Sequence, residues 1–146
     1  MDINEHRDYT VINGVNTKVS SDDGDYTIHN MILNPSPYEK ILSGRKTMEL
    51  RLYDEKRKKI DLGDRIIFTN LDDPKQRIAV KVIGLHRYET FDDLFKNISL
   101  EKCGYDSSET LHDAVRRIKE YYSEDQINKY GVLGIEIELV DTDSIL

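Results

Sequence analysis

The sequence predicts an α+β domain built on a small mixed β-barrel of about five to six strands flanked by short helices. Short stretches with an apolar residue at every second position recur along the chain, and tight turns join them. Helical patterns lie between some of these stretches but do not alternate with them one by one. With 146 residues, the chain is long enough for one hydrophobic core and too short for two, so we expect one domain.

The first 25 residues mix Asn, Asp, Gly, Thr and Ser with isolated apolar residues. This composition predicts a partly flexible extension, with one short strand near Tyr9 to Val11. The domain is expected over residues 26–141, and residues 142–146 form a polar tail.

A strand is predicted over Tyr26 to Leu33. The prolines that follow end this strand, because proline donates no hydrogen bond to a ladder, and Pro37 suits the start of a helix. A short helix is predicted over Tyr38 to Ser43, and Gly44 lies where a left-handed C-terminal cap is expected.

The segment Lys46 to Tyr53 places Met48, Leu50 and Leu52 on one face, which predicts a half-buried strand. Glu49 and Arg51 then share the opposite face. Two further strands, Arg65 to Asn70 and Arg77 to His86, are separated by a turn and predict a hairpin.

Thr90 is expected to cap a short helix that buries Phe91, Leu94 and Phe95. Ser107 or Ser108 is expected to cap a longer helix that runs to Tyr122, and Ser123 to start a short turn. A last strand is predicted over 132–140.

Composition limits the function classes. The net charge is −7 and the pI is near 5.1, which argues against binding nucleic acid through bulk positive charge. The single cysteine, Cys103, cannot form an internal disulfide and indicates a reducing compartment. We expect a cytoplasmic monomer with no membrane segment, no metal and no organic cofactor.

Positive charge is nevertheless concentrated in one part of the chain. Eight basic and five acidic residues lie between Gly44 and Arg65, including the run Lys56 to Lys59. This window predicts one basic patch on an acidic body, although a charge run of this kind is more often a solvated loop.

The segment Gly44-Arg45-Lys46-Thr47-Met48-Glu49-Leu50-Arg51 matches the pattern G-x-K-x-x-E-x-R. With the preceding helix, the Gly63-Asp64 turn and the closing segment from Tyr130 to Ile135, it resembles the ASCH domain family of the PUA-like superfamily, in its small, bacterial-type, single-domain form. The resemblance covers roughly residues 26–140. It implies a PUA-like fold in which the motif lines a cleft beside the barrel.

What the resemblance implies for function is binding of RNA or of a modified-nucleoside or nucleotide-like ligand. One branch of the wider family hydrolyses acetylated cytidine, and for that amidohydrolase alternative the residues are Lys46, Thr47 and Glu49. In that branch Lys46 would be the base, but a threonine nucleophile stands where this chain has Glu49. A nuclease or a protein-interaction domain is a further alternative.

The predicted ligand-binding residues combine cations, a carboxylate and amide or hydroxyl groups that suit phosphates and base edges. They are Arg45, Lys46, Glu49, Arg51, Thr69 and Asn70. Without the resemblance, Lys46, Glu49 and Arg51 would be read as an ion-paired network that only fixes the strand. Aromatic rings that can stack on unpaired bases are offered by Tyr38, Tyr53, Tyr88 and Tyr130.

Overall fold

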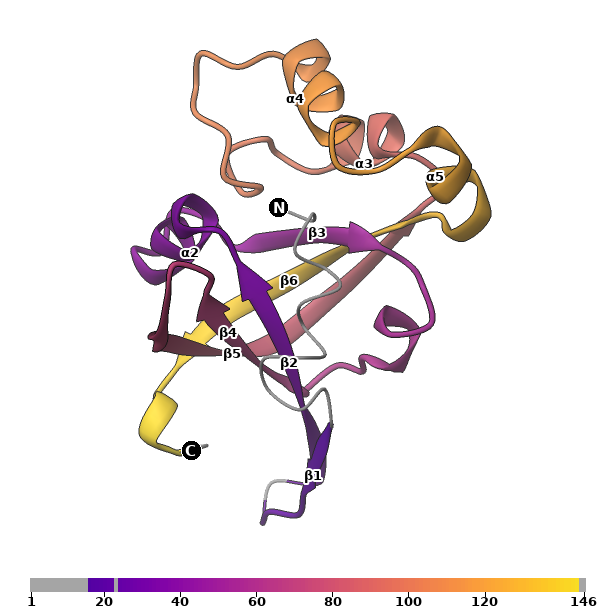
Figure 1. The fold of residues 1–146 in the computed structure, drawn as a ribbon. Coiled ribbons are helices and arrows are strands. Elements are labelled where there is room, and N and C mark those ends of the chain that lie inside the picture. The colour runs from indigo at the N-terminus through magenta and orange to yellow at the C-terminus, as the bar shows by residue number, and fades with distance from the viewer. Residues whose placement is uncertain (1–15, 23, 145–146) are drawn as a thin grey trace.

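The computed structural model describes residues 16–22 and 24–144. Within this part of the chain six strands form one sheet (Figure 1): β1 (Thr17–Val19), β2 (Tyr26–Leu33), β3 (Met48–Leu52), β4 (Arg65–Asn70), β5 (Asp73–Tyr88) and β6 (Val132–Val140). The helices are α2 (Pro35–Leu42), α3 (Phe91–Asn97), α4 (Leu111–Ile118) and α5 (Glu124–Tyr130), with short 3-10 turns η2 (Arg57–Lys59) and η3 (Thr142–Ser144).

The strand order is β1-β2-β4-β5-β6-β3. The pair β2 and β4 is parallel, with α2 and β3 in the connection between them, and every other pair is antiparallel. The predicted α+β class and mixed sheet of six strands are therefore confirmed. The sheet is open and not closed into a full barrel, because β1 and β3 are its two edges.

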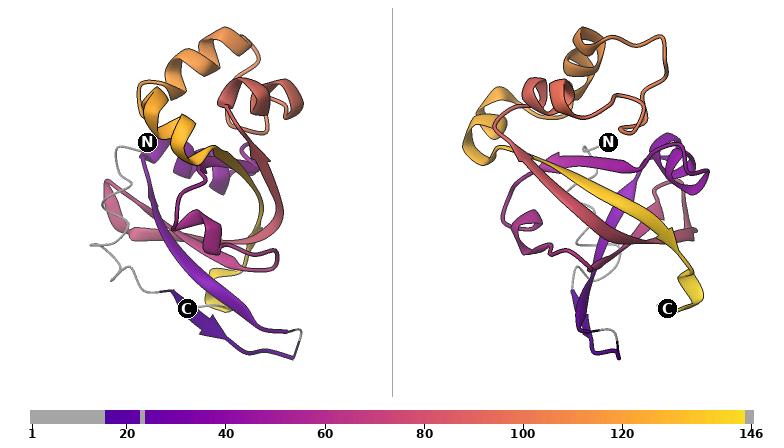
Figure 2. Two further views of the ribbon diagram at one scale, coloured as in Figure 1. Left: turned by 90° about the vertical axis from the view of Figure 1, so that its right-hand side faces the viewer. Right: turned by 180° about the vertical axis from the view of Figure 1, so that it is seen from behind.

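The helices lie at two places around the sheet. Figure 1 and the turned views of Figure 2 show α3, α4 and α5 gathered at one end, beyond β3, whereas α2 lies at the side of the sheet next to β4. All five residues of β3 are buried, so both of its faces are covered. One of these faces packs against α3, α4 and α5.

Two apolar clusters make up the core. The first lies between the inner face of the sheet and α2, and includes Met31, Ile41, Phe68 and Leu133. The second joins Met48, Leu50 and Leu52 of β3 to the helices α3, α4 and α5. The face of β3 that was predicted to be apolar is therefore the face that packs against these helices.

Local sequence explains where several elements begin and end. Thr90 accepts a hydrogen bond from the Asp93 backbone N–H, which caps α3 as predicted. Gly44 has φ +81°, the left-handed conformation that was expected after the first helix. Ser123 caps α5, and the predicted hairpin is formed by β4 and β5.

Three sequence-based expectations need correction or fall outside the description. The strand β3 is buried along its whole length and not half-buried, because its second face carries an enclosed ion-paired network. The cap of α4 is Thr110, in a reciprocal capping box with Asp113, and the helix ends at Ile118. The strand expected near residues 9–11 lies outside the described residues.

The N-terminal extension contributes to the sheet, since β1 lies within the first 25 residues and pairs with β2. Among the described residues, no helix has the length and apolar character required to span a membrane.

Candidate functional site

The carboxylate of Glu49 lies at the centre of a buried three-residue network. Lys46 Nζ is 2.8 Å from Glu49 Oε1, and Arg51 Nε donates to Glu49 Oε2 at 2.8 Å. Arg51 also donates through one terminal nitrogen to the backbone carbonyl of Ile32 on β2, at 3.2 Å. The network therefore connects the edge strand β3 to β2. In the strand order of the sheet, β4, β5 and β6 lie between these two strands.

Burial and charge act in opposite directions on Glu49. Its removal from water alone would raise the pKa of the carboxyl, but the charges and hydrogen bonds of Lys46 and Arg51 together outweigh burial and lower the pKa to about 2. Lys46, Glu49 and Arg51 are only 8%, 3% and 1% exposed. Glu49 is therefore an ionised anchor for two cations.

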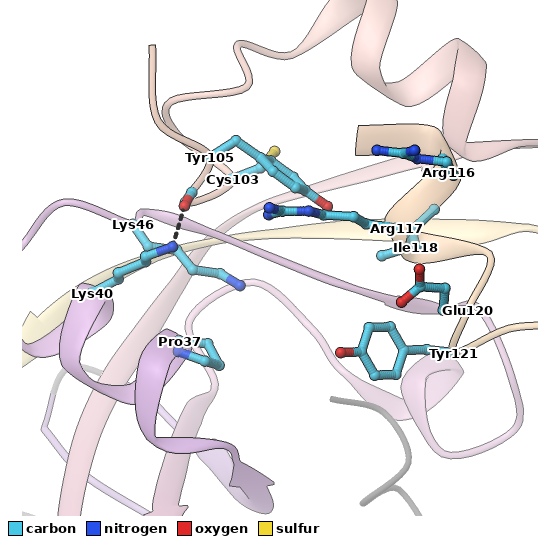
Figure 3. Close-up of a pocket in the computed structure, with 11 residues that line it drawn as sticks. Pro37, Lys40, Lys46, Cys103, Tyr105, Arg116, Arg117, Ile118, Glu120 and Tyr121 are labelled. Carbon is cyan, nitrogen blue, oxygen red and sulfur yellow. Dashed lines mark hydrogen bonds between the residues drawn. The ribbon is translucent and has the colours of Figure 1, made fainter. Parts of the chain in front are cut away.

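A pocket of about 480 Å³ lies next to this network, between α2 and α4. Lys46 lines it, whereas Glu49 and Arg51 are buried behind Lys46 and do not. Figure 3 shows Pro37 and Lys40 of α2 on one side of the space, and Arg117, Glu120 and Tyr121 on the other. We call this space the cationic pocket.

Four basic side chains and one acidic side chain line the cationic pocket: Lys40, Lys46, Arg116, Arg117 and Glu120. Lys40 donates to the carbonyl of Gly104 at 2.7 Å, which ties α2 to the loop after α3 (Figure 3). Arg117 pairs with Glu109 at 2.8 Å and is itself more than half exposed. The pocket is thus positively charged although the chain as a whole is acidic.

The remaining polar groups of the pocket are neutral. Tyr105 packs edge-on against Phe95, and burial raises the pKa of its phenol. Cys103 is 4% exposed, and burial raises the pKa of its thiol to about 12 despite the nearby Lys46. The thiol is therefore protonated near neutral pH and is not an activated nucleophile.

The other predicted site residues lie elsewhere. Arg45 lines an adjoining hollow that shares Lys40, Gly104 and Tyr105 with the cationic pocket. Thr69 and Asn70 are buried at the end of β4 and do not line the cationic pocket. The Asn70 side chain donates to Gln76 and accepts from the Asp72 backbone N–H.

Thr47 and Glu49 were named for the hydrolase alternative. The backbone N–H of Thr47 donates to the Lys102 carbonyl, and its own carbonyl accepts from Ile137, so the residue is fixed between two segments. The Glu49 oxygens are both engaged by cations. The geometry thus assigns Glu49 to holding Lys46 and Arg51 in place.

The basic run after β3 is not a uniform solvated loop. Arg57 is 1% exposed and pairs with Asp54 at 3.2 Å, while Lys56 donates to the carbonyl of Asn30. Lys58 and Lys59 remain exposed at the surface. This run lines no part of the cationic pocket.

Sequence reasoning missed four further residues that line the pocket, namely Lys40, Tyr105, Arg116 and Arg117. Arg116 and Arg117 are adjacent on the polar side of α4. Two adjacent basic residues are equally typical of a helix face that is simply exposed to solvent, so they did not indicate a binding site. Of the tyrosines proposed to stack on bases, Tyr38 is only 3% exposed and belongs to the first core cluster. Across the described residues, no three His, Cys, Asp or Glu side chains are grouped so as to hold a metal ion.

The open mixed sheet, the covered edge strand and the motif network define an α+β domain with a PUA-like fold. The model of the ASCH domain matches residues 31–141, and the chain belongs to the ASCH domain family.

Solved structures agree with this assignment. The crystal structure of hypothetical protein PH0355 is 35% identical, with TM-score 0.66 over 76% of this chain and 97% of that chain. Protein PF0455 from Pyrococcus furiosus is 31% identical, with TM-score 0.63 over 78% of this chain and 98% of that chain. ASCH from Zymomonas mobilis is 14% identical, with TM-score 0.55 over 78% of this chain and 73% of that chain, and shares the fold. No curated protein matches the sequence significantly.

Proposed function

We propose that the cationic pocket binds a nucleotide unit, either free or as part of an RNA strand. The observation that carries this proposal is the position of Lys46, whose ammonium lines the pocket while the buried Glu49 holds it at 2.8 Å. A ligand phosphate meets a cation that is already fixed in place, so little side-chain entropy is lost on binding.

The charge of the pocket supports a phosphate-bearing ligand. Lys40, Arg116 and Arg117 surround the same space as Lys46, on a chain with net charge −7. Arginine guanidinium groups donate to phosphate oxygens in pairs, and lysine acts as a point charge. Positive charge that is concentrated in one pocket of an acidic protein favours contact with one or a few phosphates. It does not favour binding of nucleic acid through the overall charge of the protein.

The neutral groups of the pocket support a base or a sugar beside that phosphate. Tyr105 is half-buried and Tyr121 is 41% exposed, and both line the space. Aromatic rings of this kind stack on unpaired bases. The ASCH family membership supports RNA binding in general terms, and the ligand is our inference from the pocket.

The experiment is an NMR titration of labelled protein with cytidine, N4-acetylcytidine, cytidine monophosphate and a six-nucleotide single-stranded RNA. Saturable shifts of the amides of Lys46, Cys103, Gly104 and Arg117 are expected with the monophosphate or the RNA. A response to the monophosphate alone identifies a free nucleotide, and a stronger response to the RNA identifies a strand. Amides that stay unchanged with all four ligands contradict the proposal.

A double variant tests the charge argument without disturbing the core. Arg116→Ala with Arg117→Ala removes two exposed cations of the pocket, and should weaken RNA binding and lower its salt dependence by about one unit of log–log slope. Lys18→Ala, which removes one exposed charge on β1 at the other end of the molecule (Figure 1), should change neither. An unchanged affinity and slope in the double variant contradict the assignment of the phosphate to this pocket. Released acetate from N4-acetylcytidine would favour the hydrolase alternative.

A further inference from the structure

Three of the nine tyrosines gather in a second pocket at the opposite end of β3 from Lys46. This pocket has a volume of about 680 Å³ and is lined by Tyr53, Tyr88 and Tyr130 together with Arg87, Glu89 and Lys129. We call it the tyrosine pocket. Tyr53 lies seven positions after Lys46 along an extended chain, which places the two pockets roughly 20 Å apart.

Two of the three rings of the tyrosine pocket, those of Tyr53 and Tyr130, lie next to cations. The Arg87 guanidinium lies 4.0 Å from the centroid of the Tyr53 ring, and Lys129 Nζ lies 5.1 Å from that of Tyr130. Lys58, from the exposed part of the basic run, lies 5.7 Å from the Tyr53 ring. Glu89 is the acidic residue of the lining, so this end of an acidic chain combines aromatic surface with positive charge.

The three tyrosines lie on segments that meet at one backbone junction. Gly131 follows α5 with φ +73°, and its carbonyl accepts a hydrogen bond from the Tyr53 backbone N–H at 3.0 Å. A Cβ atom at this position would lie 3.2 Å from the carbonyl of Tyr88, so the glycine allows the close approach. Tyr53, Tyr88 and Tyr130 are therefore tied to each other through neighbouring backbone, and each ring is half-buried.

We propose that the tyrosine pocket binds unpaired bases of single-stranded RNA, as a site separate from the cationic pocket. Half-buried rings fixed in place give bases a stacking surface, and the Arg87 guanidinium offers a further plane on which a base can stack. Arg87, Lys58 and Lys129 contact the flanking phosphates. A proline-rich peptide also docks on aromatic rings, but it gains nothing from three cations placed over them.

This site does not depend on the function proposed for the cationic pocket. The two share no lining residue, and the basic run after β3 places Lys58 near the Tyr53 ring of this pocket. One RNA strand can occupy both sites, or either site alone. The experiment must therefore report on each pocket separately.

The test measures fluorescence anisotropy of a labelled ten-nucleotide single-stranded RNA with wild-type protein and with Tyr88→Leu, Tyr130→Leu and Arg87→Ala. Each tyrosine-to-leucine change keeps apolar bulk and removes the stacking ring, and should weaken binding roughly tenfold. Tyr88→Phe and Tyr130→Phe keep the ring and should bind within twofold of wild type. Lys18→Ala is the matched charge control for Arg87→Ala and should leave the affinity unchanged.

Three results would overturn the proposal. They are unchanged affinity in folded tyrosine-to-leucine variants, equal binding of a duplex of the same sequence, and no binding of the single strand at all. If the leucine variants do not fold, an NMR titration of the wild-type protein decides instead. Saturable shifts of the amides of Tyr53, Arg87, Tyr88 and Gly131 are then expected with the RNA, and unchanged amides there refute the site.

The same titration separates the two proposals. Shifts at Tyr88 and Gly131 without shifts at Lys46 and Gly104 support the tyrosine pocket and contradict RNA binding at the cationic pocket, and the reverse pattern does the opposite. A proline-rich decapeptide added in place of RNA should cause no shifts at Tyr53 or Tyr130. Shifts with the peptide and none with RNA refute the present assignment.

Discussion

Lys46 Nζ and Glu49 Oε1 lie 2.8 Å apart, and the two residues differ in what they face. Lys46 lines the cationic pocket, whereas Glu49 is enclosed behind it and also holds Arg51. A buried carboxylate with two cations is costly to separate, because removing one partner leaves an uncompensated charge away from water. The stability of β3 and the position of the pocket cation thus depend on the same carboxylate.

Acid should therefore destabilise the protein in part through Glu49. Its pKa is about 2 in the folded state and near 4.5 without the network, so the unfolded chain takes up the proton more readily. This contribution to the free energy of unfolding is complete above pH 4.5 and is lost as the pH falls towards 2. Between pH 5 and pH 3 we expect the wild type to lose roughly 2 kcal/mol more than Glu49→Gln, measured by urea denaturation.

Glu55→Gln is the matched control for this measurement. Glu55 is exposed and pairs with Lys58 at the surface, so its removal should leave the pH dependence of the wild type unchanged. If Glu49→Gln does not fold, the Glu49 carboxyl can be titrated directly by carbon NMR in the wild type. A midpoint near 4.5 would contradict the network as we describe it.

The Cys103 thiol should resist alkylation in the folded protein. Burial raises its pKa to about 12, so at pH 8 the thiolate is roughly a thousandfold scarcer than in an exposed cysteine. We expect iodoacetamide to label the protein slowly in buffer and rapidly in guanidinium chloride, as followed by mass spectrometry. Because the chain has one cysteine, the labelled mass reports on this site alone. Equal rates in both conditions contradict the burial of Cys103.

The motif network could be predicted from the sequence because it is local. Lys46 and Glu49 are three residues apart, and the alternation of β3 places Glu49 and Arg51 on one face. The caps of α3 and α5 were predictable for the same reason, since a capping side chain bonds a backbone group three residues away.

The pocket could not be predicted in this way because its walls come from distant parts of the chain. Lys40 and Gly104, which are hydrogen-bonded, are 64 residues apart, and α4 is brought over α2 only by the packing of the second core cluster. Nothing in the sequence next to Arg116 and Arg117 indicates that they line a binding pocket. The tyrosine pocket depends likewise on a junction between β3, β5 and the start of β6.

The corrected start of α4 can be tested by removing its cap. Thr110 Oγ1 accepts from the Asp113 backbone N–H at 3.2 Å, and Asp113 accepts in return from the Thr110 N–H at 3.1 Å. Thr110→Ala should lower the free energy of unfolding by about 1 kcal/mol. Ser107→Ala, at a position that the sequence also offered as a cap, should change it by less than about 0.5 kcal/mol. If Ser107→Ala lowered the free energy of unfolding more than Thr110→Ala did in urea denaturation, the cap would be the serine.

The junction at Gly131 should tolerate substitution less well than another glycine of positive φ. Gly131 has φ +73° and ψ −174°, a region that is essentially restricted to glycine, and an added Cβ would also lie 3.2 Å from the Tyr88 carbonyl. Gly131→Ala should therefore destabilise the protein by roughly 1–3 kcal/mol or more, and should weaken RNA binding at the tyrosine pocket.

Gly44→Ala is the control, because its φ is +81° and no atom lies within 4 Å of an added Cβ. It should cost only about 1 kcal/mol and leave RNA binding unchanged. Equal losses of stability in the two variants would mean that strain at φ alone, and not the contact with Tyr88, makes Gly131 necessary.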